Sequence, residues 1–555
     1  MDAFMSWVQK DGNKQLYYHN LRFDGEFLLT WLFRHGFRHV SNEVKAIPEG
    51  CFQTLISDTG QFYKLTICFK RRKKKVKRCE IFDSLKKLPF RVAQIAKDFG
   101  LDQAKGTIDY TMPRPEGYQL TEEEREYIIT DCSIVQQALH FQIEEGKKKM
   151  TIASDALTDY KERVGRQFEY WFPVLPKALD DDLRKAYKGG FTWLQPRHAG
   201  AMLHNGITLD VNSLYPSVMY FKPLPYGYPV YFEGEPEPDP MFPLYIVKFR
   251  CAFRVKPDHI PTVQIKKGIF SETEYLTSSE IDGDLHEVTM TMTSVDLELF
   301  LDHYDVIGDI RWFSGFKFKA QVGMFKDYID YWSHIKATAP KNSAQRALAK
   351  LMLNSLYGKF ASATERLQKV PYMAPDGVVR YYTYHEPERD KDGNLVFDHR
   401  GRLVFQRDEA GHLVPREREI VDPVYTPVGA FITAWARDTT IRAAQAVYDR
   451  FVYADTDSLH LLGTELPEGL RIHPTDLGAW DHEATWTEAK FLRAKTYIET
   501  IDGQLKVTCA GMPDNVKELV TYETFNAGAV FPGKLLPRRV KGGVILDAVD
   551  FTIQL

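Results

Sequence analysis

Two aspartates in an otherwise apolar stretch are the residues of this chain best suited to charge-dependent chemistry. Residues 451–462 read FVYADTDSLHLL, which places Asp455 and Asp457 between two runs of strand-forming side chains. Two carboxylates about 4 Å apart repel by roughly 4 kcal/mol at an effective dielectric constant of about 20. A cation bound between them, or a proton on one of them, would relieve that repulsion. The segment is therefore either a metal site or an ordinary solvated acidic turn.

The flanking residues predict an antiparallel β-hairpin that holds both aspartates at its tip. Side chains two apart in a strand point to one side, so Asp455 and Asp457 share a face unless the turn moves one away. A third aspartate, Asp210, ends an apolar run, and Ser213 with Pro216 then predicts a helix start. That helix N-terminus would present N–H groups to an anion beside Asp210. A capping role explains Ser213 but does not explain a lone aspartate in an apolar strand.

A stripe of polar side chains marks one face of the helix predicted over residues 343–357. Spacings of four, four and three residues keep these side chains on one side, and Gly358 is placed to end the helix. Two cations, an amide and a phenol suit a triphosphate and a base, although an ordinary exposed face has a similar composition. The stripe consists of Arg346, Lys350, Asn354 and Tyr357.

A further pair of acids lies near the start of the chain. Residues 16–32 predict a strand followed by a helix, with Asp24 at the junction, a usual position for catalytic carboxylates. The acidic segment 121–124 predicts a helix start, and Tyr127 and Asp131 would share one face of that helix. A helix cap at Asp24 and a surface position for Asp131 are the structural alternatives.

Other segments predict the elements that position these residues. Seven of the eight residues 71–78 are Lys or Arg and form a hairpin tip that is either solvated or in contact with DNA. The paired glycines 189–190 allow backbone to approach a ligand or a tight turn. Residues 386–419 hold a degenerate repeat whose D-G and G-x-L-V steps predict successive β-hairpins. Residues 424–448 predict a helix, and residues 495–497 predict part of a strand.

Composition limits the class of protein. The 555 residues, of which 44% are hydrophobic and 26% charged, suffice for several domains, and the net charge of -3 gives no global attraction to nucleic acid. Six scattered cysteines without ligand-like spacing predict neither a zinc site nor a disulfide framework. No apolar run reaches membrane-spanning length, and no P-loop motif occurs. The sequence predicts a soluble cytoplasmic protein with no membrane partner.

Four motifs occur in the order known from family B DNA polymerases, and the chain resembles that family. They are D-x-x-S-L-Y-P-S from Asp210, K-x-x-x-N-S-L-Y-G from Lys350, Y-x-D-T-D-S from Tyr453 and K-x-Y from Lys495. The Y-K-G-G segment from Tyr187 and the long insertion that follows Asp210 are similar to the protein-primed branch, as in the replicative polymerases of small Bacillus phages with terminal-protein-capped linear genomes. The resemblance implies an α+β multidomain right-hand fold with an RNase H-like α/β exonuclease domain at the N-terminus and two β-rich insertions.

The resemblance also implies how the chain is divided and what it binds. The expected partners of a monomer are DNA template and primer, deoxynucleoside triphosphates and a terminal protein that serves as primer. The expected activity is nucleotidyl transfer with strand displacement on a linear viral genome. The implied parts are an exonuclease domain (1–150), a palm (151–222 and 424–512), a terminal-protein-region insertion (223–322), fingers (323–361), a second insertion of β-hairpins (362–423) and a thumb (513–555).

Roles for the acidic residues follow from the same resemblance. Asp210 and Asp457, together with Val211, would hold two Mg²⁺ ions, with Mn²⁺ as a substitute, and Asp455 would support them. Two metals about 3.5 to 4 Å apart suit an in-line displacement at phosphorus. Lys495 would hold the primer terminus.

Roles for the remaining motif residues concern the incoming nucleotide. Tyr357 would stack on the nascent base pair, and Tyr215 would lie under the sugar and exclude a 2′-hydroxyl. The residues expected to bind the triphosphate are Lys336, Arg346 and Lys350, with Asn354 beside them.

The exonuclease part of the resemblance is incomplete. Asp24 matches the second exonuclease motif, Tyr127 and Asp131 match the third, and Lys105 matches an additional catalytic lysine. The first motif, a D-x-E on the opening strand, is missing, and the strings from Asp24 and Asp481 that imitate it lie elsewhere. With two of four acids absent, Asp24 and Asp131 cannot complete a two-metal site. We therefore expect an N-terminally truncated chain with impaired proofreading and a poorly stabilised N-terminal sheet.

Two rival functions fit parts of the sequence. An inactive remnant that binds DNA or terminal protein would explain the missing exonuclease motif. An RNA-templated or ribonucleotide polymerase would also carry an acidic hairpin, but Tyr215 argues against ribonucleotides.

Overall fold

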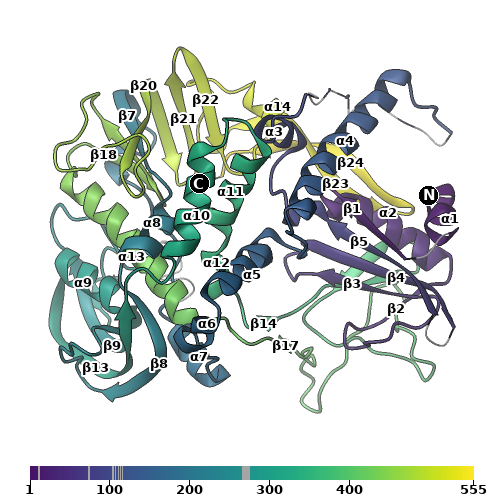
Figure 1. The fold of residues 1–555 in the computed structure, drawn as a ribbon, viewed down its shortest axis with the longest axis horizontal. Coiled ribbons are helices and arrows are strands. Elements are labelled where there is room, and N and C mark those ends of the chain that lie inside the picture. The colour runs from purple at the N-terminus through teal and green to yellow at the C-terminus, as the bar shows by residue number, and fades with distance from the viewer. Residues whose placement is uncertain are drawn as a thin grey trace.

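The computed structural model describes residues 1–555 except 11–12, 73–74, 103–105, 107, 110–111, 113, 115–116, 265–274 and 555. Lys105 and the tip of the basic segment 71–78 therefore lie outside the described residues. Within the described part, no helix combines the length and the apolar character needed to cross a membrane. Most elements group around three larger sheets (Figure 1), which we call the N-terminal, central and insertion sheets.

The N-terminal sheet has five strands in the order β1-β5-β4-β3-β2. β1 and β5 are parallel, whereas β4 and β5 are antiparallel, which confirms the hairpin predicted around the basic segment. α4 begins with the capping box of Thr121 and Glu124, as the acidic first turn predicts. The elements are α1 (Asp2–Lys10), β1 (Lys14–Tyr18), α2 (Leu21–Arg34), β2 (Arg38–His39), β3 (Cys51–Ile56), β4 (Phe62–Arg72), β5 (Lys75–Asp83), a 3-10 turn (Ser84–Lys86), α3 (Val92–Asp98) and α4 (Glu122–Glu144).

The core of the N-terminal sheet is well filled. Leu28 and Leu29 of α2 are fully buried against Phe52 and Ile81 of the strands, and Val379 from far along the chain joins the same cluster. Burial of apolar surface stabilises by about 25 cal/mol per Å². This packing argues against the poorly stabilised sheet that we expect from the sequence.

The central sheet has seven strands in the order β22-β21-β20-β7-β19-β18-β6, and α8 and α13 pack on one of its faces (Figure 1). The predicted hairpin at 451–462 and the predicted helix at 424–448 are both present, as β18–β19 and α13. The elements are α5 (Ile152–Val164), α6 (Gln167–Trp171), α7 (Lys177–Arg184), β6 (Thr192–Leu194), a 3-10 turn (Pro196–His198), β7 (Met202–Val211), α8 (Leu214–Phe221), α13 (Thr426–Ala446), β18 (Phe451–Asp455), β19 (Ser458–Leu462), β20 (Trp480–Arg493), β21 (Thr496–Ile501) and β22 (Gln504–Cys509).

The insertion sheet follows α8 and has the order β12-β9-β13-β8. Three helices then lead back toward the central sheet. The predicted helix over 343–357 ends earlier than expected, because α11 stops at Ser355 and Gly358 lies inside a further helical turn, not at a C-terminal cap. The elements are β8 (Leu224–Glu233), β9 (Leu244–Val255), β10 (Glu280–Ile281), β11 (Asp284–Leu285), β12 (Val288–Thr293), α9 (Ser294–His303), β13 (Tyr304–Gln321), α10 (Lys326–Thr338), α11 (Ala344–Ser355) and α12 (Tyr357–Phe360).

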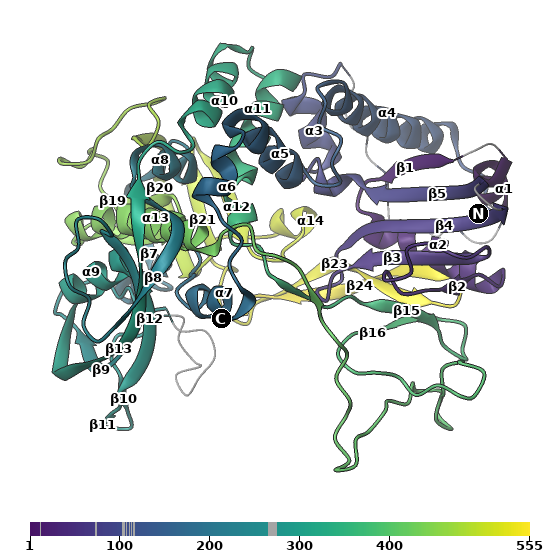
Figure 2. The ribbon, with the colours of Figure 1, turned by 60° about the horizontal axis from the view of Figure 1, so that its bottom comes forward.

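Residues 362–423, which the sequence predicts to be a second insertion, project from the body (Figure 2). Its strands are β14 (Glu365–Arg366), β15 (Val370–Met373), β16 (Val379–Tyr382) and β17 (Glu419–Ile420). Between β16 and β17 the repeat forms three tight turns, at Asp390, Asp398 and Asp408, and the carboxylate of each aspartate accepts N–H groups of its own turn. Bridges such as that between Phe397 and Leu403 join the arms, which confirms the predicted successive hairpins.

The chain ends in a long antiparallel hairpin, which we call the C-terminal hairpin. Its strands β23 (Val530–Val540) and β24 (Gly543–Thr552) follow α14 (Asp514–Lys517). The hairpin leaves the central sheet and reaches α2 beside the N-terminal sheet (Figures 1 and 2).

Candidate active site

Asp210 and Asp457, which are far apart in the chain, meet on the central sheet. Asp210 occupies the end of β7, directly opposite Ser458 of β19. The backbone N–H of Val211 donates to the carbonyl oxygen of Asp457 at 2.8 Å, so the β18–β19 turn is fixed against the end of β7. The two aspartates therefore belong to one rigid sheet and can act on one ligand.

The turn that carries Asp457 is held by a close backbone contact. Thr456 adopts a left-handed conformation with φ of 62°, and its N–H donates to the carbonyl oxygen of Phe191 at 2.6 Å. A Cβ atom on Gly190 would lie 2.8 Å from the Thr456 hydroxyl oxygen, so only glycine fits there. The paired glycines thus serve a tight turn, one of the two uses that the sequence leaves open.

Asp455 and Asp457 have different surroundings. The Lys495 ammonium group donates to both carboxylate oxygens of Asp455, at 2.9 and 2.8 Å. The Tyr453 and Thr192 hydroxyls lie 3.3 Å from the same carboxylate. Lys495 sits in the turn between β20 and β21 with φ of 57°, not within a strand as the sequence suggests. Asp455 is therefore neutralised within the protein, whereas Asp457 faces Asp210.

The electrostatics of the aspartate pair favour binding of a positive charge. Burial, followed by the charges of Asp457, Glu483 and Asp481, raises the pKa of Asp210 to about 7, although Lys350 acts in the opposite direction. Burial also raises the pKa of Asp457, with Asp455 adding to the effect. Like charges that are buried together without a cation disfavour ionisation.

Two acids of this site are absent from the sequence-based assignment. Asp481 lies directly opposite Asp210 because β20 is the neighbour of β7, and Glu483 is close enough to act on both aspartates. In the sequence, Asp481 and Glu483 form a D-x-E string that resembles the first exonuclease motif but lies in a different part of the chain. β20 pairs with β7 although the two strands lie about 270 residues apart in the sequence. No local sequence pattern predicts a pairing between strands that are so far apart.

The chemistry of this donor set fits a hard divalent cation. Mg²⁺ prefers carboxylate and carbonyl oxygens and takes only one or two carboxylates from a protein. Asp210 and Asp457 supply two carboxylates, and the backbone at Val211 adjoins them. Among the described residues, no group of three or more His, Cys, Asp or Glu side chains is arranged to hold a metal, so a dedicated cage of the zinc type is not present there.

Three cations gather beside the aspartates. Lys336 of α10 donates to the Ser213 hydroxyl at 3.1 Å, and Arg346 of α11 donates to the Lys336 carbonyl oxygen. Burial, then Arg346 and Lys350, lowers the pKa of Lys336. Within the described chain none of the three forms an ion pair with a carboxylate, which leaves them available to an anion. Ser213 stands at the helix start as predicted, but its side chain binds Lys336 and does not cap α8.

Two tyrosines form a flat surface next to this cation cluster. The rings of Tyr215 and Tyr357 stack with centroids 4.1 Å apart and planes inclined by 10°. Burial raises the pKa of both phenols, so they stay neutral at working pH. Asn354 lies on the same helix as Arg346 and is exposed. The structure thus brings Lys336 and Arg346 together beside Ser213 and stacks Tyr215 on Tyr357, and Lys350 and Asn354 lie farther along α11.

The acids of the N-terminal part line a separate cavity of about 1340 Å³ between β1 and α4. Asp24, Tyr127 and Asp131 contribute to its wall, and Asp24 lies in the first turn of α2, slightly beyond the predicted junction. Burial, with a contribution from Asp83, raises the pKa of Asp24. Of the described residues that line the cavity, Asp24 and Asp131 are the only two with carboxylates. The assignment of Lys105 falls outside the described residues.

Comparisons with known proteins agree with this geometry. Residues 8–400 match the family model for DNA polymerase type B, organellar and viral. The DNA polymerase of Bacillus phage Nf is 44% identical, over 100% of this chain and 93% of the relative, and that of Bacillus phage phi29 is 44% identical over 100% and 92%. The structure of phi29 DNA polymerase complexed with primer-template DNA and incoming nucleotides has a TM-score of 0.87, 44% identity and coverage of 100% and 93%.

These matches bear on the predicted fold class and on the expected truncation. The predicted fold class, a right-hand family B polymerase with an exonuclease domain, is confirmed by the similarity to the phi29 enzyme. The expectation of an N-terminally truncated chain finds no support in these matches, which cover this whole chain and 93% of the relative. The chain belongs to the family B DNA polymerases, in the group of the phi29-like Bacillus phage enzymes, and is a DNA polymerase.

Proposed function

We propose that this polymerase replicates a linear phage genome by Mg²⁺-dependent, protein-primed nucleotidyl transfer with strand displacement. The observation that carries the metal-dependent part is the convergence of Asp210 and Asp457 beside three cations that form no ion pair among the described residues. A buried acid pair next to a cation cluster is complementary to a divalent ion with a triphosphate.

The residues of the site divide the work of the reaction. The primer 3′-oxygen forms a bond to the α-phosphorus of the nucleotide while the bond to pyrophosphate breaks. Asp210 and Asp457 would hold the metal ions, which when bound supply positive charge to the attacking and leaving oxygens. Lys336, Arg346 and Lys350 would bind the triphosphate and stabilise the charge that develops on pyrophosphate.

The tyrosine pair selects the nucleotide in this proposal. The Tyr357 ring would stack on the nascent base pair, and the Tyr215 ring would occupy the space beneath the sugar. Because the rings are stacked on each other with planes nearly parallel, neither can turn aside to admit a 2′-hydroxyl without disturbing the other. This arrangement supports deoxyribonucleotides as substrates and opposes the ribonucleotide alternative.

The expected partners follow from similarity and from the insertions. Solved phi29 complexes contain primer-template DNA, incoming nucleotides or single-stranded DNA, and we propose the same ligands for this chain acting as a monomer. A terminal protein would dock on the insertion sheet, which stands apart from the central sheet (Figure 1). The second insertion would help to separate strands.

Incubation with a candidate terminal protein, labelled deoxynucleotides and Mg²⁺, without any oligonucleotide, tests protein priming. Extension of an oligonucleotide primer is measured in parallel, with Asp457→Asn as control. We expect labelled terminal protein and extended primer with the unmodified chain only. Incorporation no greater than that of Asp457→Asn would favour the inactive remnant instead.

Metal binding should depend on pH because protons compete for Asp210. The pKa of that carboxyl is about 7 in the absence of metal, so the metal must displace a proton below this pH. We expect the affinity for Mg²⁺ to rise about tenfold from pH 6 to pH 8, mostly below pH 7. Calorimetric titration over this range measures it. An affinity independent of pH would show that Asp210 is not a ligand.

We also propose that the 3′-5′ exonuclease of this chain is impaired. Asp24 and Asp131 supply two carboxylates to their cavity, whereas a two-metal nuclease site needs more acidic ligands. We expect degradation of labelled single-stranded DNA with Mg²⁺ to be unchanged by Asp131→Ala. Fast degradation that this substitution abolishes would contradict the proposal.

A further inference from the structure

Asp159 of α5 is a buried acid that lies outside the active site and outside the N-terminal cavity. It is 9% exposed. Its Oδ1 atom accepts a hydrogen bond from Nζ of Lys147 at 2.9 Å, and its Oδ2 atom accepts one from Nε of Arg163 at 2.8 Å and one from Nε1 of Trp332 at 3.0 Å. Burial by itself would raise the pKa of Asp159, but the hydrogen bonds from Arg163, Lys147 and Trp332 lower it, so the carboxylate is charged at working pH. Asp159 therefore joins α5 to α10, whose Trp332 lies 173 residues away in the chain.

The two cations that bind Asp159 also pack on rings of α10. The Arg163 guanidinium lies 3.8 Å from the centre of the Tyr331 ring, and Nζ of Lys147 lies 5.1 Å from the centre of the Trp332 ring. Trp332 itself is 4% exposed, so its N–H group depends on an acceptor within the protein. A charged acceptor makes that hydrogen bond stronger than one between neutral groups. The contact between α5 and α10 is therefore both strong and directional.

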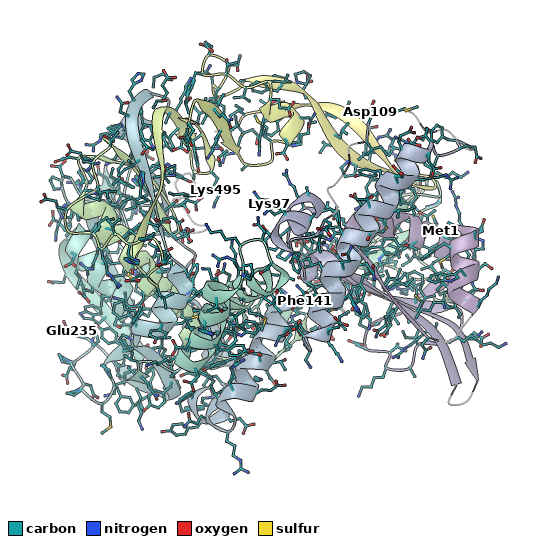
Figure 3. All side chains as sticks on the ribbon, turned by 45° about the horizontal axis from the view of Figure 1, so that its top comes forward. Met1, Lys97, Asp109, Phe141, Glu235 and Lys495 are labelled. Carbon is teal, nitrogen blue, oxygen red and sulfur yellow. The ribbon has the colours of Figure 1, made fainter. Side chains whose placement is uncertain are left out.

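α5 is a fixed support for this contact. Nζ of Lys87, from the N-terminal part, donates to Asp155 in the first turn of α5 at 2.6 Å, and both side chains are buried. Phe141, near the end of the preceding helix α4, packs against the cores of the N-terminal helices and of the central sheet, and Figure 3 shows it between these two parts. The Tyr160 hydroxyl of α5 donates to the carbonyl oxygen of Met324, just before α10, at 3.1 Å. α5 thus belongs to the body of the molecule on which α10 is set.

α10 carries a cation of the active site close to this contact. Lys336 follows Trp332 by four residues, and residues with this spacing lie near one face of a helix, about 6 Å apart along its axis. Nζ of Lys336 donates to the Ser213 hydroxyl, and the Lys336 carbonyl oxygen accepts a hydrogen bond from Arg346. A shift or rotation of α10 at Trp332 would therefore move Lys336 relative to the acids of the central sheet.

Apolar packing alone would not fix α10 so closely. Phe325, Tyr328 and Ile329 are buried in the large core cluster, and such burial is non-directional. It holds a helix against its neighbours but tolerates small rotations. A hydrogen bond instead requires the N–H group to point at its acceptor within about 3.2 Å. The bond from Trp332 to Asp159 therefore selects one setting of α10 on α5.

We propose that Asp159 is a positioning residue for nucleotide binding, which holds α10 through Trp332 and so places the Lys336 ammonium group where the triphosphate binds. The inference rests on the proposed function, in which Lys336 binds the triphosphate. Displacement of Lys336 would weaken binding of the nucleotide before and during the reaction alike. Such a change raises the half-saturating nucleotide concentration and leaves the maximal rate nearly unchanged.

The test measures addition of a single nucleotide to a fixed primer-template at increasing concentrations of the deoxynucleoside triphosphate. Trp332→Phe removes the indole N–H group and keeps an aromatic ring, and Asp159→Ala removes the acceptor. Loss of a hydrogen bond to a charged group shifts an equilibrium by about tenfold or more. We expect each variant to raise the half-saturating nucleotide concentration about tenfold, with little change in the maximal rate or in the affinity for primer-template.

A matched control comes from the same helix. The Tyr328 hydroxyl donates to the carbonyl oxygen of Met352 in α11 at 2.7 Å, so Tyr328→Phe removes one buried hydrogen bond of α10 without releasing the helix from Asp159. We expect this variant to melt at a lower temperature and to keep the half-saturating concentration of the parent. Trp332→Phe keeps a buried apolar ring, so it tests the proposal even if Asp159→Ala, which leaves two cations without their carboxylate, folds poorly.

A double-mutant cycle with Lys336→Ala shows whether the effect passes through this lysine. Trp332→Phe should add little to the half-saturating concentration of Lys336→Ala. An unchanged concentration in Trp332→Phe, an equal rise in Tyr328→Phe, or an undiminished further rise in the Lys336→Ala background would each overturn the proposal. Lys336→Ala with the half-saturating concentration of the parent would instead count against the triphosphate role of Lys336 in the proposed function.

Discussion

Asp210→Asn is expected to abolish nucleotide incorporation and, at the same time, to make the metal-free protein more stable. The carboxylate is one of the two that would hold the metal ions, and loss of one electrostatic stabiliser commonly costs on the order of 10² to 10³ in rate. The amide keeps the shape of the side chain but removes a charge that is buried beside Asp457 without a cation. Function and stability therefore make opposite demands on this position.

The sign of the stability effect follows from the pKa. Asp210 has a folded-state pKa of about 7, above its ordinary value of 3.8, so the folded protein binds more protons than the unfolded chain in between. Stability then falls as pH rises from about 4 to 7 and stays reduced above that range. We expect Asp210→Asn to melt a few degrees higher than the unmodified chain at pH 8, with little difference at pH 4.

Thermal melts with and without Mg²⁺ complete this experiment. Mg²⁺ should raise the melting temperature of the unmodified chain, since it binds only the folded state, and should have little effect on Asp210→Asn. A variant that melts lower than the parent at pH 8 in EDTA would show that the carboxylate is satisfied within the protein. That result would remove the electrostatic argument for a metal.

Local sequence patterns were sufficient to predict much of the active site. The β18–β19 hairpin, α13 and the position of Asp210 at the end of β7 follow from apolar periodicity and turn residues. The resemblance to family B polymerases supplied the order of the parts and the nucleotide-binding residues. The end of α11 was misplaced, because Gly358 resembles a helix cap although the chain continues into α12.

Contacts between distant segments could not be predicted in the same way. Asp481 joins the site through the register of β20 on β7, and Asp159 binds a tryptophan, Trp332, that lies 173 residues away in the chain. In the sequence, Asp159 is one more acid on a helix that already has Asp155. The role of such a residue is set by what packs on it, and this depends on how whole domains are placed.

Lys495→Ala is expected to reduce incorporation by about 10²-fold while stability changes little. The ammonium group bonds both oxygens of Asp455, but 58% of the lysine side chain is exposed, and exposed ion pairs contribute only about 0–1 kcal/mol to folding. Loss of the Lys495 ammonium group should affect the active site more than it affects folding. Asp455 would become one more uncompensated acid, and the charges of Asp455 and Lys495 both act on the pKa of Asp457.

A double-mutant cycle with Asp455→Ala tests whether Lys495 acts through this aspartate. If it does, the double variant should incorporate nucleotides no more slowly than Lys495→Ala, and Lys495→Arg should keep much of the activity, because a guanidinium can also bond both carboxylate oxygens. Single-turnover incorporation and the pH at which it is half-maximal are the measurements. The half-maximal pH should rise in Lys495→Ala, since Asp457 then ionises less readily, and should return toward the parent value in the double variant. Independent, additive losses would place Lys495 on the primer terminus alone, with Asp455 as a bystander.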